Sequence, residues 1–177
     1  MTERIIIAGA GGQGIMLLGK VLAEAAMREN KFVTWLPAYG AEVRGGTAHC
    51  MVTVSDKKIG TPYLEKTDIL IIMNAPSLKK FFPRLKAGGL LIANSSLVRL
   101  APQKMARTIK GPFTDIAVRL GNIKVANMAA LGCLIAQKKI VSFKTVLKLT
   151  ITDMAPKGKE ALIQVNQKAL EEGAGLK

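Results

Sequence analysis

The chain has 177 residues, of which 49% are hydrophobic, so it is long enough for a buried core and too apolar to be disordered. Two cysteines are too few for a disulfide framework or for a four-thiolate iron–sulfur cluster within this chain, and with a single histidine the chain is a poor zinc binder. We therefore expect a reduced, cytoplasmic protein. The net charge of +14 points to partners that carry negative charge. All apolar runs are shorter than the roughly 20 residues of a membrane span, and no signal peptide pattern precedes the first run, which argues against membrane contact.

Strand and helix patterns alternate along the first half of the chain. An uninterrupted apolar run predicts a buried strand over 4–8, and apolar residues three and four positions apart predict a helix over 14–29. A second strand over 31–36 is expected to end at Pro37, and three glycines then predict a loop over 37–46. The same patterns predict the remaining elements, namely strands over 47–55, 68–73, 90–93 and 106–109 and helices over 76–86, 113–120, 124–138, 142–150 and 156–172.

The predicted helix over 76–86 has signals at both ends. Pro76 and Ser77 are favourable residues for a helix start, and Gly88 and Gly89 are expected to end the helix. Because apolar strands alternate with helices and no change of composition marks a second domain, we predict a single Rossmann-like α/β domain over 1–177. Its sheet is expected to be mostly parallel, with helices on both faces.

A glycine-rich turn follows the first predicted strand. Gly9, Gly11 and Gly14 fit the pattern G-x-G-x-x-G between a strand and a helix, where free backbone N–H groups at the helix start can hold an anion. In a dinucleotide site, an acidic residue should follow at the end of the second strand, but none occurs before Glu42, so an NAD site is disfavoured. Three interpretations stay open: a phosphate or other polar ligand, contact with a partner subunit, or a tight turn without a ligand.

The loop over 37–46 is the second candidate site, because ligands gather at this edge of an open α/β sheet. Its polar side chains are Tyr39, Glu42 and Arg44, and Gly45 and Gly46 follow. The Arg44 guanidinium can offer a planar fork to a phosphate or a carboxylate, with Glu42 holding it in place. The alternative is a surface loop tied by a Glu–Arg pair of little energetic weight.

Four further polar residues lie close to these segments. We expect His49 to be a sheet residue without a catalytic role, since no carboxylate lies near it in the sequence, and Cys50 to pack in the same strand. Asn74 follows the strand over 68–73 and is therefore expected at the same edge as the glycine turn. Asn127 opens a buried helix, where its amide either points into the cleft or caps the helix.

The basic residues are spread along the chain with no aromatic residues interleaved, which argues against stacking on nucleic acid bases. Solvated helix faces, an acidic partner protein and a polyphosphate ligand all fit this distribution.

Four segments in combination resemble one known family. They are GAGGQG at 9–14, WLPAYGAEVRGGTAHC at 35–50, GTPYLEKTDILIIMNAPSLKKF at 60–81 and ANMAALG at 126–132. Over roughly residues 3–135 the chain resembles the gamma subunit of 2-oxoacid:ferredoxin (acceptor) oxidoreductases. The RGGTA form, preceded by WLPAYG, is more similar to the 2-oxoglutarate and branched-chain 2-oxoacid types than to the pyruvate type.

The resemblance implies a reaction that this chain does not perform alone. The whole enzyme decarboxylates a 2-oxoacid on thiamine diphosphate, transfers the acyl group to coenzyme A, and passes electrons through iron–sulfur clusters to ferredoxin or flavodoxin. Thiamine diphosphate, magnesium and the clusters are then expected on alpha, beta and ferredoxin-like delta subunits, with no catalytic residue on this chain, which is expected to form a homodimer when isolated.

By the same resemblance, this domain packs beside the thiamine site and helps to close over coenzyme A. The residues expected to take part are Gly9, Gly11, Gly12, Gln13, Gly14, Tyr39, Glu42, Arg44, Gly45, Gly46 and Asn74. The alternatives are a stand-alone nucleotide-binding protein with a Rossmann-like fold and a basic scaffold or nucleic-acid protein.

Overall fold

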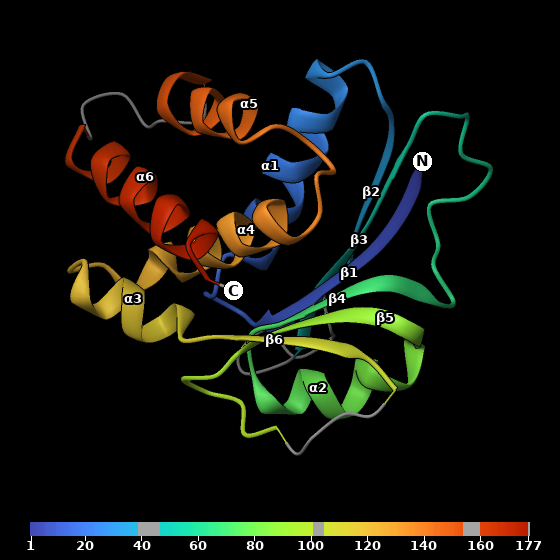
Figure 1. Ribbon diagram of the computed structural model, residues 1–177, viewed down its shortest axis with the longest axis horizontal. Helices are drawn as coiled ribbons and strands as arrows, with labels where there is room; N and C mark the ends of the chain where they lie inside the picture. The colour runs from blue at the N-terminus through green and yellow to red at the C-terminus, as the bar shows by residue number, and fades with distance from the viewer. Residues whose placement is uncertain (39–46, 101–104, 154–159, 177) are drawn as a thin grey trace.

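The computed structural model describes residues 1–38, 47–100, 105–153 and 160–176. A six-stranded sheet in the order β2-β3-β1-β4-β5-β6 divides the molecule into two layers (Figure 1). The strands are β1 (Thr2–Ala10), β2 (Phe32–Ala38), β3 (Thr47–Ser55), β4 (Thr67–Ile72), β5 (Leu85–Asn94) and β6 (Arg107–Gly111). Neighbours from β1 to β6 pair in parallel, whereas β3 is antiparallel to both β1 and β2. The predicted α/β class with a mostly parallel sheet is confirmed, with β3 as the exception.

Helices cover both faces of the sheet, as predicted. The helices are α1 (Ile15–Arg28), α2 (Ala75–Phe81), α3 (Phe113–Arg119), α4 (Ala126–Gln137), α5 (Phe143–Lys148) and α6 (Glu160–Ala174). Of the helices in the described residues, α2 covers one face, while α1 and α4 pack on the other with α3, α5 and α6 around them (Figure 1). None of the helices in the described part of the chain is both long and apolar enough to cross a membrane.

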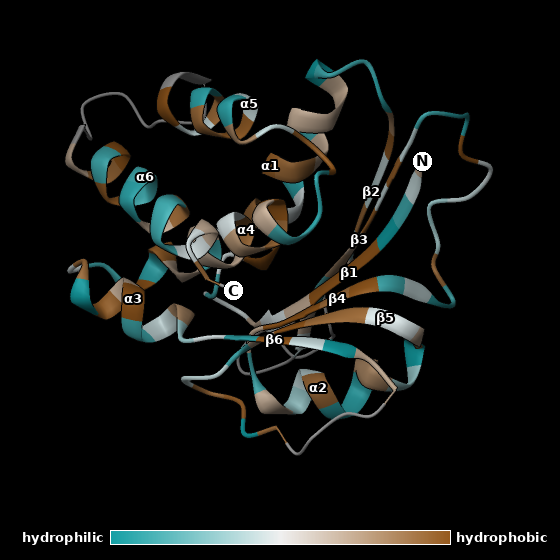
Figure 2. Cartoon of the chain, in the orientation of Figure 1, coloured by the Kyte–Doolittle hydropathy of each residue, from teal (hydrophilic) through white to brown (hydrophobic). Residues whose placement is uncertain are grey.

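The core has two parts because side chains alternate across the sheet. Along β1, Ile5 and Ile7 face the larger cluster under α1 and α4, whereas Ile6 and Ala8 face the smaller cluster under α2. All four are fully buried. The hydrophobic colour accordingly fills the inner part of the central strands, as an apolar run without alternation predicts, and gives way to paler or hydrophilic colours toward one end of them (Figure 2).

The prediction that Pro37 ends the second strand is wrong. Strand β2 continues through Pro37, which pairs in register with Cys50, and ends at Ala38. Since β2 is at the edge of the sheet, a residue without an N–H group can be accommodated there.

The prediction that Gly88 and Gly89 end a helix over 76–86 is also wrong. Helix α2 ends at Phe81, a 3₁₀ turn follows over Phe82–Arg84 with Pro83 in it, and β5 begins at Leu85. Both glycines lie inside β5, where the register with β4 shifts, and Gly88 has a φ of 74°. They therefore belong to a bulge in the strand.

The other predicted elements are present with shifted ends. The helix predicted over 142–150 becomes α5 followed by a π-helical segment over Leu149–Asp153, and the start of the one predicted over 156–172 lies outside the described residues. The predicted strand over 106–109 is β6.

Helices α4 and α6 cross in very close contact. A Cβ atom at Gly132 would overlap the main-chain oxygen of Leu170, and one at Gly173 would overlap that of Ala129. The two glycines thus lie on opposite sides of the same crossing, and the backbone cannot withdraw without separating the helices.

We predict that Gly132→Ala and Gly173→Ala each lower the free energy of unfolding by about 1–3 kcal/mol, because an added methyl group meets main-chain atoms. Urea denaturation measures the effect. Gly175→Ala is the matched control, since its Cβ would have its nearest neighbour, the oxygen of Glu172, at 3.4 Å. Equal stability of all three variants would contradict the close crossing.

Candidate functional site

The glycine turn lies at the carboxyl edge of the parallel strands. Strand β1 ends at Ala10, and the chain turns through residues 11–14 into α1, with Gly14 at the N-cap position. In the neighbouring strands, Met73 follows the end of β4, and Asn94 is the last residue of β5. The predicted placement of the turn and Asn74 at one edge is therefore confirmed.

Three carboxamide side chains brace this edge. Gln13 accepts a hydrogen bond from the N–H of Ala10 at 2.7 Å and donates to the main-chain oxygen of Met73 at 3.2 Å. Asn94, which is fully buried, donates to the same oxygen at 3.3 Å and to the hydroxyl of Thr114 at 2.8 Å. The ends of β1, β4 and β5 and the start of α3 are thereby linked.

Asn127 provides the third brace, from α4. Its Nδ2 donates to the main-chain oxygen of Gly14 at 3.2 Å, and the residue is 2% exposed. The sequence left two roles open for the Asn127 amide, namely pointing into the cleft or capping α4. The side chain points toward the glycine turn and does not cap the helix. Asn94 was missed at the sequence level, although a polar residue directly after an apolar strand is a signal that could have identified it.

The glycines of the turn are needed for different reasons. A side chain at Gly9 would meet Gln13, Ile15 and Met73 at 2.6–2.9 Å, and one at Gly14 would overlap Asn127. Gly12 has a φ of 89°, which a residue with a Cβ rarely adopts. A Cβ at Gly11, by contrast, would have no atom within 4 Å.

The outer side of the turn offers hydrogen-bond donors. Gly11 and Gly12 are exposed, and among the described residues nothing accepts a hydrogen bond from the N–H of Gly11, Gly12 or Gly14. The first turn of α1 contains no acidic residue, so the positive end of the helix dipole is uncompensated locally. The turn is therefore suited to an anion.

Gln13 and Asn74 differ from the glycines in that their side chains already have partners. Gln13 supports the turn from within, and the Oδ1 atom of Asn74 accepts a hydrogen bond from the N–H of Ser77 at 3.1 Å as the cap of α2. For these two side chains, the geometry favours a supporting role.

The other predicted site residues, Tyr39, Glu42, Arg44, Gly45 and Gly46, lie outside the described residues. The positions on either side of this segment are described. Ala38 is in register with His49, and Thr47 pairs with Ala10, the last residue before the glycine turn. Both flanking positions are thus at the edge of the sheet that carries the turn.

The sheet order bears on the NAD interpretation. Strand β3 lies between β1 and β2, so the end of β2 is two strand spacings, about 10 Å, from β1. In a dinucleotide site, the strand that carries the acidic ribose ligand lies directly beside β1. Two observations therefore disfavour an NAD site: the order of the strands, and the lack of an acidic residue in β2 over Phe32–Ala38.

His49 and the cysteines are packing residues. The His49 ring lies 4.6 Å from the Phe81 ring, and its pKa is lowered by burial and by the positive charges of Lys80 and Arg84. Burial raises the pKa of Cys50 to about 12 and that of Cys133 to about 11, so both thiols are protonated at neutral pH. No group of three metal-ligating side chains occurs among the described residues.

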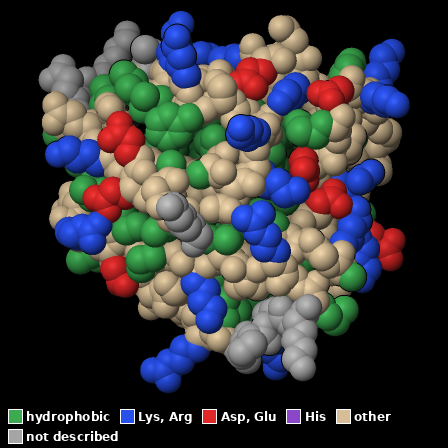
Figure 3. Space-filling model, in the orientation of Figure 1, with side chains coloured by type: hydrophobic (Ala, Val, Ile, Leu, Met, Phe, Trp, Pro, Cys, Tyr) green, Lys and Arg blue, Asp and Glu red, His purple; other side chains and the backbone are tan. Residues whose placement is uncertain are grey.

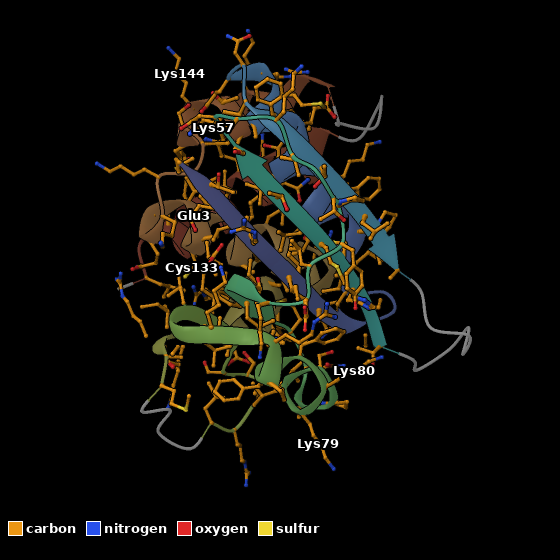
Figure 4. All side chains as sticks on the ribbon, turned by 90° about the vertical axis from the view of Figure 1, so that its right-hand side faces the viewer. Glu3, Lys57, Lys79, Lys80, Cys133 and Lys144 are labelled. Atoms are coloured by element: carbon orange, nitrogen blue, oxygen red, sulfur yellow. The ribbon has the colours of Figure 1, made fainter. Side chains whose placement is uncertain are left out.

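The positive charge is distributed over the surface. Lysines and arginines alternate with acidic residues on the face shown in Figure 3. In the view of Figure 4, Lys57 and Lys144 lie at one end of the molecule, and Lys79 and Lys80 lie at the other. The charge therefore raises the general attraction for anions without marking one site by itself.

Comparison with known proteins defines the class. The family model of pyruvate ferredoxin/flavodoxin oxidoreductase matches residues 4–176, and the chain belongs to this family. It is 36% identical over 164 residues to the 2-oxoglutarate synthase subunit KorC of Methanocaldococcus jannaschii, covering 90% of this chain and 87% of that protein. It is 35% identical over 175 residues to the ketoisovalerate oxidoreductase subunit VorA of Methanothermobacter marburgensis, covering 97% of this chain. The alignment covers 36% of that VorA protein, so this chain spans about a third of its length.

Solved structures agree with this assignment. The gamma subunit of a keto/oxoacid ferredoxin oxidoreductase from Geobacter sulfurreducens matches with a TM-score of 0.85 and 30% identity, covering 98% of this chain and 94% of that one. A 2-oxoglutarate:ferredoxin oxidoreductase from Magnetococcus marinus shares the fold, with a TM-score of 0.88 at 23% identity, and the match covers 98% of this chain and 30% of that one. The resemblance to gamma subunits is thus confirmed.

We predict that acid lowers the stability of this protein through His49. Because its pKa in the folded state is below the ordinary value of 6.5, the unfolded chain binds more protons between these two values, and stability is lost as the pH falls through that window. Urea denaturation at about pH 7.5 and about pH 5.5 should show a smaller loss for His49→Gln than for the wild type. The chain has no other histidine, so an identical loss in both proteins would refute the assignment.

Proposed function

We propose that this chain is the gamma-type subunit of a thiamine-diphosphate-dependent 2-oxoacid:acceptor oxidoreductase. The complex would convert 2-oxoglutarate or a related 2-oxoacid oxidatively to an acyl-CoA, with ferredoxin or flavodoxin as the electron acceptor. This chain supplies a non-catalytic domain that packs beside the thiamine site and helps to bind coenzyme A. The observation that carries the proposal is the match over residues 4–176, and the exposed Gly11 and Gly12 at the start of α1 in the matched domain support the role in binding coenzyme A.

The choice of substrate rests on the relatives. The match to KorC of Methanocaldococcus jannaschii covers most of both proteins, and this relative is named as a subunit of 2-oxoglutarate synthase. VorA, which is much longer than this chain, is named for ketoisovalerate. These two substrates are 2-oxoacids that differ in charge and branching, and the recognition of either would be a property of the assembled complex. A panel of 2-oxoacids tested on that complex would identify the substrate.

The role in coenzyme A binding rests on the geometry of the turn. Coenzyme A carries several phosphate charges, and no described residue accepts a hydrogen bond from the N–H groups of Gly11, Gly12 and Gly14 at the start of α1. Arg44 would add a bidentate donor from the segment whose flanking residues lie at the same edge. The Magnetococcus marinus enzyme was solved with coenzyme A and succinyl-CoA bound, which is consistent with this role for the fold.

The remaining cofactors fit other subunits better. An iron–sulfur cluster takes four thiolates, but the chain has two cysteines, and both are buried with raised pKa values. We therefore assign the clusters to other subunits, and by the resemblance to gamma subunits we assign thiamine diphosphate and magnesium to them as well, namely to alpha, beta and ferredoxin-like delta subunits. Co-purification of this chain at native expression with larger subunits that contain iron and thiamine diphosphate would support the assignment, and the absence of such subunits under these conditions would count against it.

The alternative is a stand-alone nucleotide-binding protein. Trp35 discriminates between the two functions, because it is the only tryptophan and its ring lies against Gly19 of α1. NAD-dependent quenching of its fluorescence would favour the alternative.

We predict that Gly11→Ala weakens coenzyme A binding by about tenfold, because a methyl group on the outer side of the turn keeps the phosphates away from the N–H groups. Folding should be unaffected, since no atom lies within 4 Å of the added Cβ. Gly60→Ala is the matched control, because its Cβ also meets no atom within 4 Å. Isothermal titration calorimetry on the complex provides the measurement, and equal affinities for both variants would remove the turn from the site.

Arg44 gives an independent test of the second segment. We expect Arg44→Ala to raise the dissociation constant for coenzyme A by about tenfold or more, since a charge-assisted hydrogen bond is lost. Lys144→Ala, on the exposed part of α5, is the control for the change in net charge. Equal affinity in the wild-type and Arg44→Ala complexes would exclude Arg44.

A further inference from the structure

An apolar groove of about 640 Å³, here called the helix-end groove, lies where several helix ends meet. It is lined by the last turn of α4, the connection from α4 into α5, the end of α6, and Glu29, the residue after α1. The glycine turn contacts α4 at Asn127, eight residues before Ile135, which is the first α4 residue of the groove. Because eight helical residues span about 12 Å, the groove lies outside the glycine-turn edge.

The floor of the helix-end groove is apolar. Ile135 and Val141 are 5% and 3% exposed, and the partly buried Phe143 packs against the same core. Among the described lining residues, the one hydroxyl already has partners, because the Oγ atom of Ser142 accepts a hydrogen bond from the N–H of Thr145 at 3.0 Å and lies 2.7 Å from the hydroxyl of that residue. A small polar ligand would thus find few free groups, whereas apolar side chains of a protein fit the lining.

The rim carries one positive charge that no described residue neutralises. Glu29 is engaged, because it accepts a hydrogen bond from the N–H of Ser142 at 2.7 Å and pairs with Lys31 at 3.7 Å. Lys139 also lines the groove, is exposed, and forms no ion pair within the described residues. A carboxylate next to an apolar side chain complements this combination.

The first strand and the residues after the last helix are both tied to the α4 end of this groove. The main-chain oxygen of Leu176 accepts a hydrogen bond from the side chain of Gln137 at 3.0 Å, and Lys138 pairs with Glu3 at 3.2 Å. Gln137 and Lys138 lie in the sequence between two residues that line the groove. A polypeptide joined to this domain at either side would therefore start close to the groove.

The longer relatives contain such a polypeptide. The alignment with VorA of Methanothermobacter marburgensis runs over 175 residues, which is 97% of this chain and 36% of that protein. Because the aligned stretch is no longer than this domain, the remaining part of VorA is not inserted within it and is joined before or after it. A domain tethered at that point is held near the groove at a high effective concentration.

We infer that the helix-end groove docks the partner subunit that corresponds to the remaining part of VorA. An apolar side chain of that subunit lies on the floor of the groove, and a carboxylate beside it pairs with Lys139. The inference rests on the proposed function, because it takes the multi-subunit complex from there. A second copy of this chain fits less well, since two molecules with a net charge of +14 repel each other.

Two variants at exposed lining residues test the docking. Ala136→Trp adds bulk in the groove, and Lys139→Glu reverses the charge at its rim. Lys79→Trp and Lys79→Glu are the matched controls, because Lys79 is exposed on α2, which covers the other face of the sheet. Dilution of the purified complex, followed by analytical ultracentrifugation, gives the dissociation constant of this chain from the larger subunit. Circular dichroism checks that each variant is folded.

We expect Ala136→Trp to raise this dissociation constant by about tenfold or more, because it occupies the position of an anchoring side chain. Lys139→Glu should raise it by about three- to tenfold, with a smaller effect at high salt, since an ion pair at a rim is screened. Both Lys79 variants should leave it unchanged.

A charge exchange identifies the contact itself. A photo-crosslinking amino acid in place of Ala136 marks the segment of the larger subunit that lies at the groove. Replacement of the acidic residue in that segment by lysine should restore the affinity that Lys139→Glu loses, which a merely structural effect of Lys139→Glu would not allow.

Other results overturn the inference. Unchanged dissociation constants for Ala136→Trp and Lys139→Glu would show that the larger subunit docks elsewhere, while the proposed function stands. Loss of self-association of this chain in Ala136→Trp, with the complex intact, would assign the groove to a second copy. Weaker binding of coenzyme A in an intact Ala136→Trp complex would assign it to a small ligand. If no larger subunit accompanies the wild-type chain, the proposed function itself is rejected, and the inference with it.

Discussion

The main-chain oxygen of Met73 is the point on which the site depends. It accepts hydrogen bonds from both Gln13 and Asn94, so the carbonyl at the end of β4 connects the glycine turn to the end of β5. Buried main-chain groups at the end of a strand must find partners, and here the partners are side chains that also fix the turn. The shape of the turn is therefore set by the protein itself before any ligand is present.

This bracing has consequences for α1. Gln13 and Asn127 hold the turn from the strand side and from α4, while no described residue accepts a hydrogen bond from the N–H groups of Gly11, Gly12 and Gly14. Because the donors are already oriented, an anion that binds there does not have to order the loop, which reduces the entropic cost of binding. The same arrangement places Leu17 and Asn127 in the lining of one groove of about 700 Å³, which lies beside the turn.

The antiparallel strand β3 explains why this chain has a dinucleotide-type turn without the rest of a dinucleotide site. Its insertion between β1 and β2 moves the end of β2 one strand away from the turn, and it returns the chain to Ala10 through Thr47. The strand that would carry the ribose-binding acidic residue in a dinucleotide-binding protein therefore does not lie beside β1 in this chain. Ala10 and Thr47, which are 37 positions apart in the sequence, pair at the edge of the sheet that carries the turn.

The sequence by itself determined the strands, most helices and the glycine turn, because each of these follows from local periodicity and from residues within one turn of each other. It also determined the family, since four motifs occur in the expected order. It did not determine the direction of β3, the strand character of Pro37 or the bulge at Gly88, because these depend on which strand lies next to which. Only the tertiary structure brought Asn94, Asn127 and Gln13 to one turn and Leu17 to the groove beside it, because contacts between residues as far apart as 14 and 127 follow from the packing of helices on the sheet rather than from local sequence.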